Sequence, residues 1–146
     1  MKIALPAFVL YIIYKNKSVC GTMRTENLKL EELLIVKYFV INSGRESTCY
    51  HEFYKGKWDG KTFWKDDSLL LHDDVMLENR GFVDAIMEVI PTYDPFGVTE
   101  ISLEMWKKIG QVIRDKDESS KELYQEADVW LKDVFEEYAC FTILGL

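Results

Sequence analysis

The spacing of apolar residues predicts strands in the first half of the chain and helices in the second. Residues 5–14 are apolar at nearly every position, which is typical of a strand buried on both faces. Residues 48–58 are rich in aromatic side chains and also predict a strand, and residues 68–75 and 141–146 predict two shorter ones. Residues 27–41 follow no single period, so a helix and a strand both stay open there.

The pair Asp59-Gly60 gives the strongest turn signal in the chain, because both residue types tolerate a positive φ. We therefore predict a hairpin at this pair, with residues 61–64 returning beside the strand at 48–58. A loop is expected over residues 92–99, where Pro95 presets φ for a turn and Gly97 allows the chain to continue.

Three segments with helical periodicity occupy the second half. Residues 81–90 predict a helix that ends before Pro91. Ser102 is suited to cap a second helix that extends to Arg114. The expected core face of that helix contains Trp106, Ile109 and Ile113.

The last helix is predicted from a capping box formed by Ser119 and Glu122, and it should extend to about Tyr138. Its expected core face contains Leu123, Ala127, Trp130, Leu131, Val134 and Tyr138. Because strands come early and helices late, the pattern indicates an α+β fold. We expect an antiparallel sheet from the N-terminal half, packed against C-terminal helices.

Composition indicates one globular domain over residues 1–146, with 48% hydrophobic and 29% charged residues. The formal net charge is −7, from 25 acidic and 18 basic residues. Nucleic-acid binders usually carry the opposite sign, since they must neutralise phosphates. The charge therefore argues against direct nucleic-acid binding and permits a basic protein as partner.

The three cysteines Cys20, Cys49 and Cys140 are far apart and form no close pair, so zinc and thioredoxin-like sites are not indicated. Scattered thiols are typical of a reducing compartment, and we expect a cytoplasmic protein without a membrane span. The first 20 residues keep two interpretations, a buried strand and a targeting segment, because the apolar run is too short to cross a bilayer.

The last helix carries an acidic stripe formed by Glu122, Glu126, Asp133 and Glu137, which share one side of the helix at 3.6 residues per turn. Val129 lies within this stripe as an apolar point among carboxylates. A helix face selected only for stability would mix charge signs, because like charges four residues apart repel. The stripe is a candidate surface for a basic partner. An ordinary solvated helix face is the other interpretation.

A second acidic cluster lies around residues 66–78 and includes Asp66, Asp67, Asp73 and Asp74, with His72 among them. Carboxylates with a histidine are able to bind a hard metal ion or to serve in acid–base chemistry. The spacing matches neither an EF-hand nor a His-Glu-x-x-His motif. We therefore expect these residues to contribute to a partner-binding surface, with no metal and no cofactor.

Catalytic signals are weak, since the chain has two histidines and no nucleophile elbow, P-loop or dinucleotide motif. We expect a binding protein rather than an enzyme. Two alternatives stay open. One is a small enzyme or ligand-binding domain whose pocket is lined by Tyr50, Trp58 and Trp64, and the other is an assembly subunit that packs on another chain through residues 141–146.

Segment 93–101, with the sequence YDPFGVTEI, is followed by Trp106 on a predicted helix. In these features and in its acidic composition, the chain resembles bacterial toxin-immunity proteins of contact-dependent inhibition and related polymorphic toxin systems. The resemblance implies a small cytoplasmic α+β protein that neutralises a cognate toxin domain by direct binding. It also implies a basic partner, such as a nuclease domain. No functional residue is carried over, because these families share no diagnostic residues.

Overall fold

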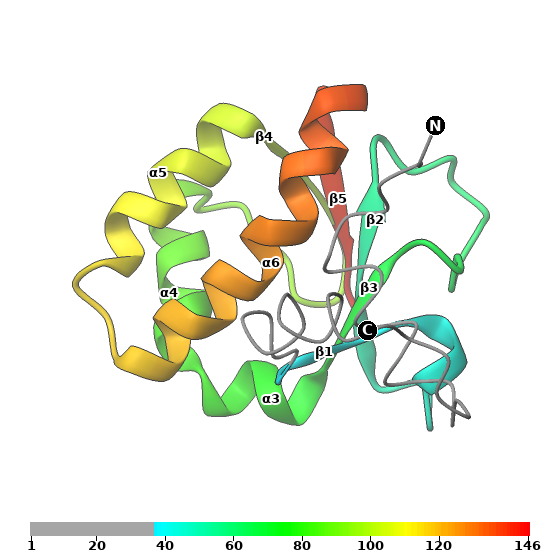
Figure 1. Cartoon of the computed structure of the whole chain (residues 1–146), viewed down its shortest axis with the longest axis horizontal. Helices are drawn as coiled ribbons and strands as arrows, with labels where there is room; N and C mark the ends of the chain where they lie inside the picture. The colour runs from blue at the N-terminus through cyan, green and yellow to red at the C-terminus, as the bar shows by residue number, and fades with distance from the viewer. Residues whose placement is uncertain (1–36) are drawn as a thin grey trace, which may run out of the picture.

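A computed structural model describes residues 37–146 and shows a five-stranded antiparallel sheet with helices packed on one face (Figure 1). The strand order is β1-β3-β2-β5-β4. The strands are β1 (Phe39–Val40), β2 (Tyr50–Lys55), β3 (Leu69–His72), β4 (Val98–Ser102) and β5 (Cys140–Leu144). The predicted α+β class is confirmed, although β4 and β5 come from the second half of the chain.

The helical elements lie between these strands. They are η1 (Asn42–Gly44), α3 (Asp73–Glu78), α4 (Arg80–Val89), α5 (Leu103–Ile113) and α6 (Glu118–Glu137). As predicted, Ser102 caps α5, and its hydroxyl accepts a hydrogen bond from the Met105 amide at 3.2 Å. The helix predicted over residues 81–90 is also confirmed, as α4.

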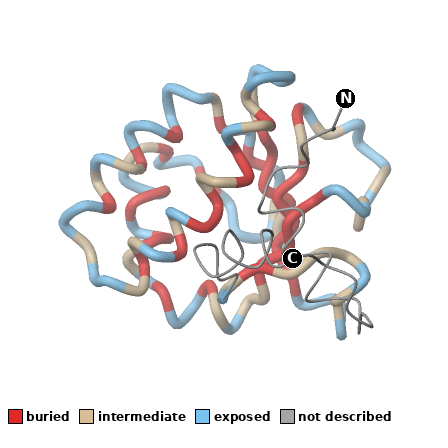
Figure 2. The backbone as a smooth tube through the Cα atoms, in the orientation of Figure 1, coloured by how far each residue is buried: buried red, intermediate tan, exposed pale blue. Residues whose placement is uncertain are grey.

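The core lies between the sheet and the helices, where buried positions concentrate (Figure 2). Successive strand residues point to opposite faces, so β2, β3 and β5 send alternate large side chains toward the helices. Trp106 of α5 stands edge-on to Phe141 of β5, with ring centroids 5.5 Å apart. Each fully buried side chain of this size contributes about 1.5–3 kcal/mol relative to exposure. The residues that the sheet gives to the core are Phe39, Phe53, Leu69, Leu71, Ile101, Phe141 and Ile143.

The core face expected for the last helix is confirmed at five of its six positions. Leu123, Ala127, Trp130, Leu131 and Val134 are buried. Tyr138 was placed wrongly, because α6 ends at Glu137 and the Tyr138 side chain is 40% exposed.

The opposite face of the sheet is held to the long β2–β3 loop by a buried carboxylate. Glu52 is only 1% exposed, and its oxygens accept the main-chain amides of Trp64 at 2.8 Å and Lys65 at 3.0 Å. On the neighbouring strand, the Thr142 hydroxyl donates to the Gly56 carbonyl at 2.7 Å. These bonds fix residues 56–68 as a loop against the sheet.

The hairpin predicted at Asp59-Gly60 is therefore wrong. Residues 61–64 form no strand, and β2 pairs instead with β3 in the register His51↔Leu71. Asp59 does make a local turn, in which its carboxylate accepts the amides of Lys61 at 2.9 Å and Thr62 at 2.8 Å. The sequence signal at Asp59-Gly60 therefore predicts only a local turn. Residues 61–64 do not return beside β2, because the main-chain amides of Trp64 and Lys65 donate to the Glu52 carboxylate.

Three further boundaries differ from the prediction. The N-cap of α6 is Asp117 rather than Ser119, and its carboxylate accepts the Ser120 amide at 3.2 Å. The strand expected over residues 68–75 ends at His72, where the chain turns directly into α3. The loop expected over residues 92–99 ends at Gly97, because β4 begins at Val98; this strand was missed, since only two of its five residues, Val98 and Ile101, are apolar.

Some sequence-based predictions fall on residues that the structure does not describe. The strand at 5–14 and the two interpretations of the first 20 residues lie outside the described residues. The same holds for most of the segment 27–41, of which the described part contains the short strand β1.

Candidate functional site

The acidic stripe predicted on α6 is divided by the fold. Its N-terminal half holds the beginning of β1. Glu126 is buried, and its carboxylate accepts the main-chain amides of Lys37 and, at 2.8 Å, of Tyr38. Glu122 accepts the Tyr38 hydroxyl at 2.9 Å and the Lys37 ammonium at 3.3 Å. These bonds, the one from Tyr38 first, hold the pKa of Glu122 below its usual value.

Val129, at the centre of the predicted stripe, is half-buried and packs against the hydrophobic core. It therefore contributes to the attachment of α6. Asp133 and Glu137 lie farther along the helix, where Asp133 is half-buried and Glu137 is exposed. The structure thus brings Glu122 and Glu126 together at β1, and Asp133 and Glu137 at the other end of α6.

The C-terminal end of α6 is acidic and has no basic residue in its last turn. Glu136 and Glu137 are exposed there. A helix C-terminus carries a partial negative charge and favours cations, so carboxylates at this position are electrostatically unfavourable. Their placement is not explained by the stability of the helix.

The sheet brings the beginning of α5 to this same end of the molecule, as Figure 1 shows. Ser102, which precedes α5, pairs with Cys140, which is the third residue after the end of α6. Burial and then the nearby Glu100 carboxylate raise the pKa of the Cys140 thiol, and the Lys57 ammonium, also nearby, lowers it in part. Glu100 and Glu104 each lie two residues from Ser102, so the pairing of Ser102 with Cys140 places them at the end of the molecule where α6 finishes.

Three exposed apolar side chains accompany these carboxylates. Leu103 is 41%, Met105 39% and Tyr138 40% exposed. We call this surface the acidic end and define it by Glu100, Glu104, Asp133, Glu136, Glu137, Leu103, Met105 and Tyr138. Among residues 37–146, none of its five carboxylates takes part in an ion pair.

The second predicted cluster does not form one surface, because its carboxylates bind neighbouring parts of the fold. Asp66 accepts the Asn42 amide group at 3.3 Å. Asp67 lies 3.8 Å from the ammonium groups of both Lys55 and Lys65. Asp73 and Asp74 lie in the first turn of α3, where the helix dipole favours negative charge.

The buried His51 of β2 pairs with the half-buried Asp73 of α3. The His51 ring is 1% exposed, and its Nε2 lies 2.8 Å from Asp73 Oδ1. The neighbouring Cys49 precedes β2 and is exposed. Within the described residues, no group of three or more His, Cys, Asp or Glu side chains is placed to hold a metal ion.

The aromatic side chains of the alternative pocket have separate surroundings. Tyr50 is buried and stands edge-on to His72, with ring centroids 4.9 Å apart. Trp58 packs against Phe63, and Trp64 lies beneath the Arg45 guanidinium at 4.3 Å. Of these three predicted lining residues, only Trp64 borders the shallow depression formed by residues 62–67.

A groove between α5 and α6 was missed by sequence reasoning. Its volume is about 690 Å³, and its lining includes the basic residues Lys107, Arg114, Lys121 and Lys132. Lys107 and Arg114 are seven residues apart and Lys121 and Lys132 are eleven apart. Both spacings are close to whole helical turns, so each pair shares a helix face. The sequence therefore indicates a basic face on each helix. That the two faces border one groove is seen only from the packing of α5 against α6.

Comparison with known proteins gives no relative: no family model matches the chain, and neither does any curated protein or solved structure. In the part of the chain that the structure describes, no helix is long and apolar enough to cross a membrane.

Proposed function

We propose that this chain is an immunity protein, which binds a basic toxin domain in the bacterial cytoplasm and neutralises it by direct contact. The acidic end carries the proposal, because five carboxylates there accompany three exposed apolar side chains. The resemblance of segment 93–101 to immunity proteins and the net charge of −7 support it.

The physical reason is charge complementarity around apolar anchors. Unpaired surface carboxylates attract a basic protein over distances of about 10 Å at 0.1 M salt, and they raise the rate of encounter. The exposed rings and aliphatic groups of Tyr138, Leu103 and Met105 supply apolar area that a partner buries on contact. Lysine or arginine side chains of the partner also relieve the repulsion between the carboxylates and the end of α6.

The first experiment is an affinity pull-down of the tagged chain from its native cells, with the neighbouring genes expressed alongside. We expect a stoichiometric partner with a basic surface and toxic activity, captured less well as salt increases. A captured partner that is acidic, or one whose toxicity is unchanged by this chain, would contradict the proposal.

Charge-reversed variants then locate the interface. The double variant Glu136→Lys and Glu137→Lys should lose the partner, because it replaces attraction by repulsion. The matched control is Asp84→Lys with Glu88→Lys, which makes the same change in charge at two exposed positions of α4. Glu126 is unsuitable for this test, since its carboxylate binds the main chain at β1. Equal loss in both double variants would show that net charge, and not the acidic end, governs binding.

A further inference from the structure

The groove between α5 and α6 has the opposite charge to the rest of the protein. Four of its lining side chains are basic and one, Asp128, is acidic. The Asp128 carboxylate already accepts the Trp106 indole N–H at 2.9 Å. In a chain with 25 acidic and 18 basic residues, this excess of cations is a local exception.

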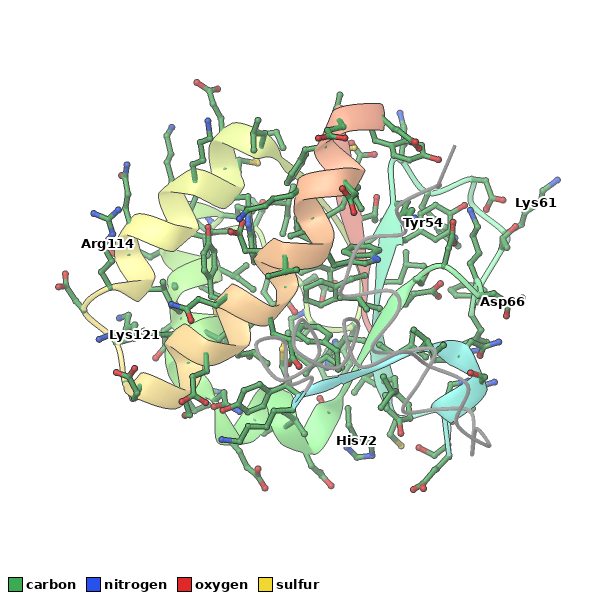
Figure 3. The ribbon with its side chains drawn as sticks, in the orientation of Figure 1. Tyr54, Lys61, Asp66, His72, Arg114 and Lys121 are labelled. Carbon is green, nitrogen blue, oxygen red and sulfur yellow. The ribbon has the colours of Figure 1, made fainter. Side chains whose placement is uncertain are left out.

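Among the described residues, most of these cations have no ion-pair partner. Lys121 lies 3.6 Å from Glu118. Within residues 37–146, Lys107, Arg114 and Lys132 make no ion pair. Lys121 lies in the first turns of α6, where the helix dipole disfavours a cation. Figure 3 shows Arg114 and Lys121 close to each other at the edge of the molecule where α5 passes into α6.

The floor of the groove is aromatic and fixed. The rings of Trp106 and Tyr124 stack with centroids 4.2 Å apart and an interplanar angle of 17°. The Tyr124 hydroxyl donates to the Trp106 carbonyl at 3.1 Å, which holds the ring across α5. A half-buried tyrosine ring between cations offers an apolar surface at the centre of a basic groove.

We propose that this groove binds an acidic peptide segment of a protein partner, with carboxylates on both sides of an apolar residue. Lys107 of α5 and Arg114, which caps the end of that helix, are seven residues apart, which corresponds to about 10 Å along the helix axis. An extended peptide advances about 3.3 Å per residue and alternates its side chains between two faces, so acidic residues four apart share one face with the residue midway between them and span about 13 Å, a length that the long lysine and arginine side chains cover. The apolar residue between them contacts the Tyr124 ring. An open groove between two helices accommodates such a segment.

The test is a selection of random peptides displayed on phage against the full chain. We expect enrichment of sequences in which Asp or Glu flank an aromatic or aliphatic residue. A synthetic peptide of the enriched sequence should bind at least ten-fold more weakly to the variant Lys107→Glu with Arg114→Glu. Both side chains are exposed, so circular dichroism and the denaturation midpoint should show that this variant folds.

The matched control is Lys57→Glu with Lys61→Glu, two exposed lysines in the β2–β3 loop. Figure 3 places Lys61 on the opposite side of the molecule from Arg114. The control should change peptide affinity less than three-fold. Enrichment of sequences without acidic residues, or equal weakening in both variants, would overturn the proposal. So would a groove that takes inorganic triphosphate but none of the peptides.

The inference does not depend on the proposed immunity function. Its variants alter the groove and leave Glu136 and Glu137 unchanged. The two surfaces meet at Leu103, which also lines the groove, and loss of the peptide with retention of a basic partner would separate them.

Discussion

At the scale of single residues, two buried glutamates hold the described fold together. Glu52 and Glu126 each accept two main-chain amides from segments distant in sequence. A buried carboxylate is costly unless it is hydrogen-bonded, and these bonds compensate for its lost hydration. Neither role is visible in the sequence, where Glu126 belongs to a surface stripe and Glu52 lies within an aromatic strand.

Replacing Glu52 by glutamine should destabilise the protein by about 1–3 kcal/mol. The amide keeps one acceptor oxygen and presents an N–H₂ group to the second main-chain amide, which then lacks a partner. Urea denaturation measures the loss. Glu46→Gln, at an exposed position, is the control and should be close to neutral. Equal stability of the two variants would contradict the role given to Glu52.

Asp59 gives a prediction for pH. Hydrogen bonds from Thr62, side chain first, lower the pKa of its carboxyl from 3.8 to about 2. Because the pKa of Asp59 is lower in the folded protein than in the unfolded chain, the ionised carboxylate stabilises the fold. This stabilisation is fully present when the pH is above the ordinary pKa of aspartate, and it is lost as the pH falls toward 2. A carboxyl NMR titration should find this midpoint. Thr62→Val should move it back toward 3.8, and an unchanged midpoint would show that the hydroxyl is not the cause.

At the scale of elements, the close contact of α5 with α6 depends on a glycine. A Cβ atom at Gly110 would lie 2.4 Å from the Tyr124 hydroxyl oxygen. Inside a helix, glycine is about 1 kcal/mol less stabilising than alanine. Its presence at position 110 is explained by the Tyr124 side chain, which leaves no room for a methyl group. The aromatic floor of the groove therefore requires a residue without a side chain at position 110.

Gly110→Ala should destabilise the protein by about 1–3 kcal/mol, because Tyr124 must move from its stack on Trp106. In a Tyr124→Ala background the same substitution should instead stabilise, by up to about 1 kcal/mol. Thermal denaturation of the four variants in this cycle measures both effects. Destabilisation of the same size in both backgrounds would contradict the contact.

The helices were more predictable than the strands, and the reason is physical. The 3.6-residue period and the Ser102 cap are local, so α4 and α5 were predicted nearly to their boundaries. Strand pairing is not local: β2 pairs with β3 and β5, and the second of these lies at the far end of the chain. The strong Asp59-Gly60 signal formed a turn but could not determine which segment returned to β2.

At the scale of the whole molecule, the charge of −7 is distributed unevenly. The acidic end lies where α6 finishes, and the basic groove extends between α5 and α6. Of the site residues predicted from the sequence, Asp133 and Glu137 lie in the acidic end. Glu100 and Glu104 were not predicted there, because the register of β4 with β5 brings them to it. The spacing of charges along one helix thus predicted Asp133 and Glu137, whereas Glu100 and Glu104 are brought to the candidate site by the pairing of strands.

The central claim is that the acidic end steers a basic partner into contact. Its most direct test is the association rate with the captured partner, measured by stopped flow over a range of salt concentrations. We predict a rate that falls steeply as salt increases, and a much weaker dependence for Glu136→Lys with Glu137→Lys. The Asp84→Lys with Glu88→Lys control should keep most of the dependence. A rate that is insensitive to salt, or the same change in both double variants, would contradict the claim.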